Sequence, residues 1–201
     1  MAEVTSPVPG LIPQSGQTAT QAAEAAFSDP ETGETLGPEL IVDGDMEAAG
    51  VEFWRDTYTP KIKVKSSEFK HGGRQSLHLV SDGSGDGVHQ IMAPFVYEEL
   101  FQVPRKALQK GKTYRVQLWV KNADPAGFEE IRLSGTALKT PLKTDDREWR
   151  KFDFRVPCDA PEATDYLVIG YGSPISDVYI DDVSVREVLA PANGNPPAAS
   201  R

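Results

Sequence analysis

The sequence predicts an all-β protein, an antiparallel β-sandwich of the jelly-roll kind with an extended arm at each end. Three observations predict this fold: many short segments alternate apolar and polar residues, Gly, Pro and Asp turns separate them, and little of the chain has helical periodicity. A length of 201 residues suits one domain of about 150 residues plus tails. We place the domain at residues 38–188, an N-terminal arm at residues 1–37 and a C-terminal tail at residues 189–201.

Both arms have the composition of chain that does not fold alone. Residues 1–37 are rich in Ala, Pro, Gly, Ser, Thr, Gln and Glu, and residues 189–201 are rich in Pro, Ala and Asn. An Ala-rich stretch at residues 18–27 is the best helix candidate, but a helix so short is marginal in water. We therefore expect an N-terminal arm that is flexible or that becomes ordered only on a partner.

The first half of the domain contains short expected strands between turns. They lie at residues 40–42, 61–65, 75–80 and 88–92. The second of these alternates strictly and puts Ile62 and Val64 on one face. Residues 94–108 fit either a strand or a helical turn, and Pro104 limits both.

The second half contains the clearest strand, at residues 113–121. Its apolar face consists of Tyr114, Val116, Leu118 and Val120, and its opposite face of Arg115, Gln117, Trp119 and Lys121. Further strands are expected at residues 131–134, 149–156, 166–172 and 177–185. This alternation at period two is typical of strands with one face on a core.

Asp181, in the last of these strands, needs a partner. Alternation would place it on one face with Tyr179, Val183 and Val185, an apolar set that we expect to face the core. A buried carboxylate costs several kcal/mol unless a cation, an arginine or several donors meet it. The alternatives are a bound metal ion, an Arg or Lys partner, or a bulge at Asp181 and Asp182 that turns the carboxylate to solvent.

The composition excludes several classes of function. A net charge of −9 argues against a nucleic-acid or anionic-membrane surface, and Cys158, the single cysteine, excludes an internal disulfide. No apolar run is long enough to span a membrane. No Gly-x-Ser-x-Gly elbow, His-Glu-x-x-His or phosphate loop occurs, so we expect no enzyme.

The N-terminus shows neither the basic region nor the apolar region of a secretory signal. We expect the protein either to act in the cytoplasm, where it is made, or to be released by lysis. Release would place it outside the cell or in a virion.

Five short motifs follow one another along the domain. They are Leu-Ile-Val-Asp-Gly-Asp-Met-Glu (residues 40–47), His-Gly-Gly-Arg-Gln-Ser-Leu (71–77), Leu-Gln-Lys-Gly-Lys-Thr-Tyr with the later Trp-Val-Lys (108–121), Trp-Arg-Lys-Phe (149–152) and Tyr-Ile-Asp-Asp-Val-Ser-Val (179–185). In this order they resemble the carbohydrate-binding modules of the family 4/9/22 type, which are galactose-binding-like jelly rolls. The resemblance covers roughly residues 38–188.

This resemblance implies a structural calcium ion that ties the first strand to the last. Carried over, its ligands are the side chains of Glu47 and Asp181, with main-chain carbonyls of Asp45, His71 and Arg74. Oxygen donors from several loops are what Ca²⁺ prefers. The implied ion agrees with the separate expectation that Asp181 needs a partner.

A sugar site needs an aromatic platform beside planar polar groups, because aromatic faces stack on the C–H surface of a pyranose while Arg and Gln bond its hydroxyls. The candidates are Arg115, Gln117 and Trp119 on the non-core face of residues 113–121, Arg132 and Ser134 on a neighbouring strand, and His89 and Tyr171 by position. The alternative for Trp119 is packing under a loop or against another chain. Trp54 and Trp149 have apolar neighbours and are expected in the core.

Two functions follow from these patterns. The first is a non-catalytic, calcium-stabilised module that recognises a glycan, such as a polysaccharide or a cell-surface carbohydrate. The alternative is a structural virion protein of a bacteriophage, either a capsid decoration protein or a tail-associated adhesin. It would use the jelly roll and the N-terminal arm to assemble with other virion proteins.

Overall fold

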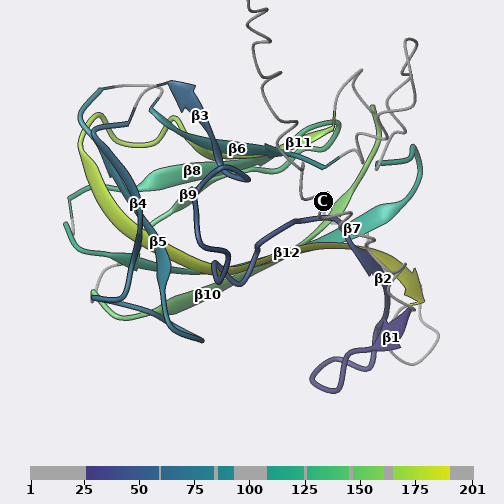
Figure 1. Cartoon of the computed structure of the whole chain (residues 1–201). Helices are drawn as coiled ribbons and strands as arrows, with labels where there is room; N and C mark the ends of the chain where they lie inside the picture. Colours follow the sequence, from purple (N-terminus) through teal and green to yellow (C-terminus); the bar gives the residue numbers. More distant parts are fainter. Residues whose placement is uncertain are drawn as a thin grey trace, which may run out of the picture.

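The computed structural model describes residues 26–58, 60–83, 86–92, 108–124, 126–144, 147–160 and 165–190. Within these ranges the chain forms strands and no helix, so no helix there could cross a membrane. The strands make two antiparallel sheets that lie face to face, as Figure 1 shows. The predicted all-β sandwich is therefore confirmed.

The two sheets differ in size and in order. The seven-stranded sheet contains β1 (Phe27–Ser28), β2 (Thr35–Glu39), β4 (Ile62–Ser66), β5 (Ser76–Ser81), β7 (Thr113–Asn122), β10 (Arg150–Pro157) and β12 (Ser176–Ala190). The five-stranded sheet runs β3 (Arg55–Tyr58), β6 (Gly87–Ile91), β11 (Tyr166–Gly170), β8 (Glu129–Leu133) and β9 (Lys139–Leu142) in that order.

The long strand β12 is the centre of the seven-stranded sheet. Along one edge it pairs with β7, and along the other it pairs first with β5 and then with β2. The strand therefore joins segments from both ends of the domain.

A bulge in β12 corrects the predicted face of Asp181. The register with β7 shifts between Asp181 and Ser184, and Asp182 has a φ of 48°. This extra residue lets Ile180 and Val183 both face the core, whereas strict alternation would put Val183 beside Asp181. Asp181 is fully buried as expected, but it lies opposite Trp119 on the outer face of the sheet, away from the core.

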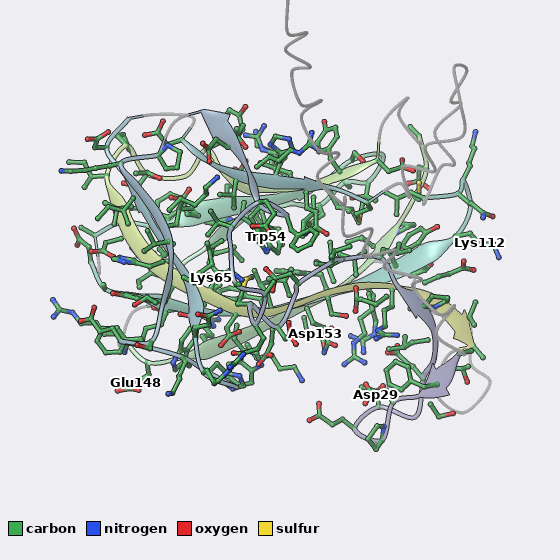
Figure 2. The ribbon with its side chains drawn as sticks, viewed as in Figure 1. Asp29, Trp54, Lys65, Lys112, Glu148 and Asp153 are labelled. Carbon is green, nitrogen blue, oxygen red and sulfur yellow. The ribbon has the colours of Figure 1, made fainter. Side chains whose placement is uncertain are left out.

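The core lies between the two sheets. Strand β7 buries Tyr114, Val116, Leu118 and Val120 there, which confirms the predicted face. Trp54, also predicted in the core, is completely buried and lies between the layers in Figure 2.

The edge strand β4 is inverted relative to an ordinary sandwich strand. Its lysines point inward: Lys65 Nζ lies 2.6 Å from Asp43 Oδ2, and the two side chains are 5% and 2% exposed. Ile62 and Val64 point outward and are 36% and 46% exposed. Inward charges on an edge strand discourage pairing with another chain. They also leave an apolar surface outside.

The first strands of the sheet lie earlier in the chain than predicted. Residues 40–42 form no strand, although Leu40 N–H still bonds to Val185 O at 3.0 Å. The pairing begins earlier, in β1 and β2, so residues 27–37 join the sheet where we had placed an arm. Residues 1–25, 93–107 and 191–201 lie outside the described residues, and with them most of the arm, the tail and the ambiguous segment 94–108.

Candidate functional site

The six predicted sugar-binding residues lie on two opposite faces of the sandwich. Arg115, Gln117 and Trp119 are on β7, on the outer face of the seven-stranded sheet. Arg132 is on β8, which pairs with β9 and β11 and not with β7. His89 is on β6 of the same five-stranded sheet, and Tyr171 directly follows β11 of that sheet. The expected single cleft is therefore corrected to two separate groups of three.

Arg115 is held by carboxylates and is not available to a ligand. Its side chain is 2% exposed and contacts Asp29, Glu34 and Asp153. The β1–β2 hairpin supplies Asp29 and Glu34, and β10 supplies Asp153. Figure 2 shows Asp29 and Asp153 on the same side of the sheet. Gln117 Nε2 also donates to Asp153 Oδ2, at 2.9 Å.

The pKa values within this group follow from the ion pairs. Burial alone would raise the pKa of Asp29, but hydrogen bonds from Arg115 and the Glu31 N–H lower it to about 2. Burial likewise opposes ionisation of Asp153, and Arg115 again holds its pKa below the usual value. The group is thus a fully charged network that fastens the hairpin to the sheet.

Trp119 is packed under a loop, the alternative that the sequence left open. The ring of His71 stacks on it with centroids 3.7 Å apart and an interplanar angle of 16°. Trp149 meets the same imidazole edge-on at 5.9 Å. Trp149 is only partly buried on this outer face, which corrects its predicted place in the core. Its immediate neighbours in the sequence, Glu148 and Arg150, are charged, which agrees with a position at the surface.

The predicted calcium residues come together around the loop of residues 71–75. Asp181 Oδ2 accepts the N–H groups of His71 and Gly72 at 2.9 and 3.1 Å, and Oδ1 accepts that of Asp182 at 2.9 Å. Burial raises the pKa of Asp181, and these N–H groups oppose the rise. Among the described residues, the partners of Asp181 are therefore backbone N–H donors.

Glu47 holds the other end of the same loop. Its Oε1 accepts the N–H groups of Arg74 and Gln75 at 2.7 and 3.1 Å, and its Oε2 accepts Arg74 Nε at 2.7 Å. These bonds, with the Arg74 N–H first, lower the pKa of Glu47 to about 2. At Gly73, where φ is 53°, a Cβ would collide with Glu47 Oε1. We call Glu47, Asp181 and the loop N–H groups that they accept the amide clamp.

The amide clamp does not fit a calcium ion in this arrangement. Each carboxylate already accepts three N–H donors, and the positive ends of those dipoles point at the oxygens that would have to face the ion. His71 and Arg74 direct their N–H groups at the two carboxylates, and Asp45 Oδ1 accepts the Glu47 N–H at 3.3 Å. In the described part of the chain, no three His, Cys, Asp or Glu residues are grouped to hold a metal. Calcium stays an untested prediction.

The outer face of the five-stranded sheet presents the second group of three. Arg132 lies over the ring of Tyr171, 4.7 Å from its centroid, and its Nε bonds to Glu130. Val168, on β11, pairs in register with His89 on one side and Arg132 on the other. These two polar side chains therefore stand roughly 10 Å apart across β11. Burial, followed by the charges of Arg55 and Lys63, lowers the pKa of His89.

Two basic residues at the edges of this face were not predicted as site residues from the sequence. Arg55 pairs with His89 from β3, and Lys139 pairs with Arg132 from β9. Neither strand was predicted, because both are short edge strands and β9 contains Pro141.

Comparison with solved structures shows which fold this is. A xylan-binding CBM22-1 domain from Paenibacillus barcinonensis superposes with a TM-score of 0.55 at 14% identity, over 77% of this chain and 97% of that one. This chain therefore has the β-sandwich fold of that carbohydrate-binding module.

Two further modules support the assignment. A family 16 carbohydrate-binding module matches over 73% of this chain and 98% of its own, with a TM-score of 0.50 and 19% identity. The family 61 module TmCBM61, solved with β-1,4-galactotriose, gives 0.52 at 14% identity, over 74% of this chain and 98% of that module. No protein-family model matches the sequence, and no curated protein does.

Proposed function

We propose that this protein is a non-catalytic glycan-binding domain whose binding surface is the outer face of the five-stranded sheet. The observation that carries the proposal is the stacked pair of Arg132 and Tyr171, with His89 in register across β11. The guanidinium, phenol and imidazole are planar groups of the kind that hydrogen-bond and stack on sugars.

The opposite outer face supports the choice by contrast. There Arg115 is buried in ion pairs with carboxylates, and the ring of His71 covers one face of Trp119. Among the matching modules, the CBM22-1 domain is a xylan-binding domain and TmCBM61 was solved with β-1,4-galactotriose. A polysaccharide is thus the partner class we propose.

Binding to a panel of soluble polysaccharides, measured by affinity electrophoresis and calorimetry, tests this function. The panel should contain neutral xylan and galactan as well as acidic polymers. We expect Arg132→Ala to weaken the retained polysaccharide about tenfold, because a bidentate, oriented donor is lost. Gln117→Ala, on the opposite face, is the matched control and should bind normally. Loss of binding in Gln117→Ala or Trp119→Ala, with Arg132→Ala unaffected, would move the site to the other sheet.

The alternative of a structural assembly protein is supported by a different surface. Ile62, Val64 and Phe69 are each more than a third exposed on the outer side of β4 and its following loop. Exposed apolar groups that lie together often mark contacts with other proteins. Assembly in a phage particle remains a prediction. Its test is whether the purified protein forms defined oligomers or binds isolated virion components, and whether Val64→Thr prevents this.

A further inference from the structure

Four basic residues form a single row across the outer face of the five-stranded sheet. In strand order the paired positions are Arg55, His89, Val168, Arg132 and Lys139. Directly paired residues of adjacent strands point to the same face, and adjacent strands lie about 4.8 Å apart. The row therefore extends over roughly 19 Å. We call Arg55, His89, Arg132 and Lys139 the basic row.

The basic row stands out against the charge of the whole protein. The chain carries a net charge of −9, yet four of the five side chains in this line are basic. Arg55 and Lys139 are exposed, and within the described residues neither forms an ion pair. Asp56 pairs with the core residue Val88 and so points to the other side of β3, where Lys63 meets it.

Within the described residues, one carboxylate bonds directly to a member of the row, and it does so at the centre. Glu130 bonds to Arg132, the residue that also lies over Tyr171. Because Glu130 neutralises part of the centre, the uncompensated charge is at Arg55 and Lys139, near opposite edges of the sheet. Arg132 is held in a fixed orientation between Glu130 and the ring of Tyr171.

The positions of these charges match one class of polymer. Nucleic acids place a charge about every 1.7 Å along a duplex, and such a dense polyanion would be repelled by the acidic remainder of the protein. Two free cations near opposite edges, with an oriented guanidinium between them, suit a chain whose anionic groups are widely spaced. A polymer with one carboxylate on each sugar residue carries its charges farther apart than a nucleic acid does, and it can place carboxylates at both ends of the row.

We propose that the basic row binds an acidic polysaccharide, one built of sugars that carry carboxylate groups. This inference rests on the proposed glycan-binding function and narrows its substrate class. Arg55 and Lys139 would meet carboxylates at either end, and the pair of Arg132 and Tyr171 would contact a sugar between those two ends. Burial and the positive charge of Arg55 lower the pKa of His89, and a bound anion beside it would act in the opposite direction and favour the imidazolium.

The test compares polymers that differ in charge. Polygalacturonate and alginate carry carboxylates, dextran sulfate carries sulfates, xylan and galactan are neutral, and duplex DNA is a dense polyanion. We expect polygalacturonate or alginate to bind, and to bind about tenfold more weakly in high salt than in low salt. The double variant Arg55→Gln, Lys139→Gln should lower that affinity about tenfold without changing the unfolding midpoint. Lys151→Gln removes one exposed cation on the opposite face, so it is the control for each of the single variants Arg55→Gln and Lys139→Gln, which should each also weaken binding.

Each other outcome identifies what has failed. Binding of neutral and carboxylate polymers with equal affinity would overturn the proposal of an acidic ligand, while the proposed glycan-binding function would stand. Preference for dextran sulfate or DNA would overturn the proposed carboxylate ligand and show that the row binds polyanions in general. Absence of binding to every polymer would overturn the glycan function and the present inference together. Equal losses of affinity in Arg55→Gln, Lys139→Gln and Lys151→Gln, each of which removes one charge, would show a net-charge effect and remove the basic row as the site.

Discussion

The two outer faces of the sandwich carry similar side chains and use them differently. On the seven-stranded sheet, Arg115 lies under the β1–β2 hairpin with three carboxylates around it. On the five-stranded sheet, Arg55 and Lys139 are exposed, and Arg132 has one carboxylate and one ring. The comparison teaches that residue type alone does not indicate a binding site. The deciding factor is whether other parts of the chain have already satisfied the charge.

The largest expected effect on stability comes from removing Arg115, the buried cation on the outer face of the seven-stranded sheet. Arg115→Ala should lower the free energy of unfolding by about 3–5 kcal/mol, because it leaves buried carboxylates without their cation. Arg132→Ala should cost less than about 1 kcal/mol, since its partners are at the surface. Urea unfolding measures both, and glycan affinity should show the reverse order. A small loss of stability in Arg115→Ala would contradict the conclusion that Arg115 neutralises buried carboxylates on that face.

The amide clamp gives the next largest effect. Asp181→Asn should cost about 1–3 kcal/mol, because the amide turns one acceptor into a donor that faces N–H groups. The neighbouring Asp182→Asn, at a partly exposed position paired with His71, is the matched control and should cost less.

The same clamp decides the calcium prediction. We expect the unfolding midpoint to be the same in excess calcium and in excess EDTA. A bound ion at about a hundred times its Kd would add about 2.7 kcal/mol, so a fall of several degrees in EDTA would show that the loop accepts calcium after all.

Glu129 extends the comparison to a carboxylate inside the sandwich. Burial raises its pKa above the ordinary 4.5, although Ser176 and Ser81 donate hydrogen bonds to it. The folded state then keeps the proton longer than the unfolded state, so stability is lost as the pH rises from 4.5 through the folded pKa. Glu129→Gln should therefore gain stability relative to the native protein as the pH rises toward 7. Glu130→Gln, one residue along on the solvent side, is the control. Parallel pH profiles for Glu129→Gln and the native protein would rule this account out.

The smallest effect is expected at the inverted edge strand. Ile62→Thr and Val64→Thr remove exposed apolar groups and keep β-branched side chains, so each should change stability by less than about 0.5 kcal/mol. Glycan affinity and mass in solution should not change. A change of mass on either substitution would favour the assembly alternative and would make this outer surface an interface.

The fold could be predicted from the sequence because strand alternation depends only on residues that are neighbours in the chain. The alternation in β7 identified the core face correctly, because period two follows from strand geometry alone. The burial of Asp181 was also predicted, but its face was wrong, since one extra residue at Asp182 reverses every position after it.

The candidate site depends on pairing, which one sequence does not show. Arg115 and Arg132 looked equivalent on alternating strands, yet β7 and β8 belong to different sheets. Asp29, which binds Arg115, is 86 residues away along the chain. Arg55 and Lys139 join the basic row only through the register of β3 and β9. Such contacts are set by tertiary packing, so no local pattern predicts them.

The position of β12 has a consequence for how the protein is made. Strands β2, β5 and β7 all pair with a segment that the ribosome produces after them, at residues 176–190. Until that segment emerges, those three strands have unpaired edges on which other nascent chains could pair. The seven-stranded sheet is therefore completed in one late step, and its many contacts between distant residues place the domain among slowly folding topologies.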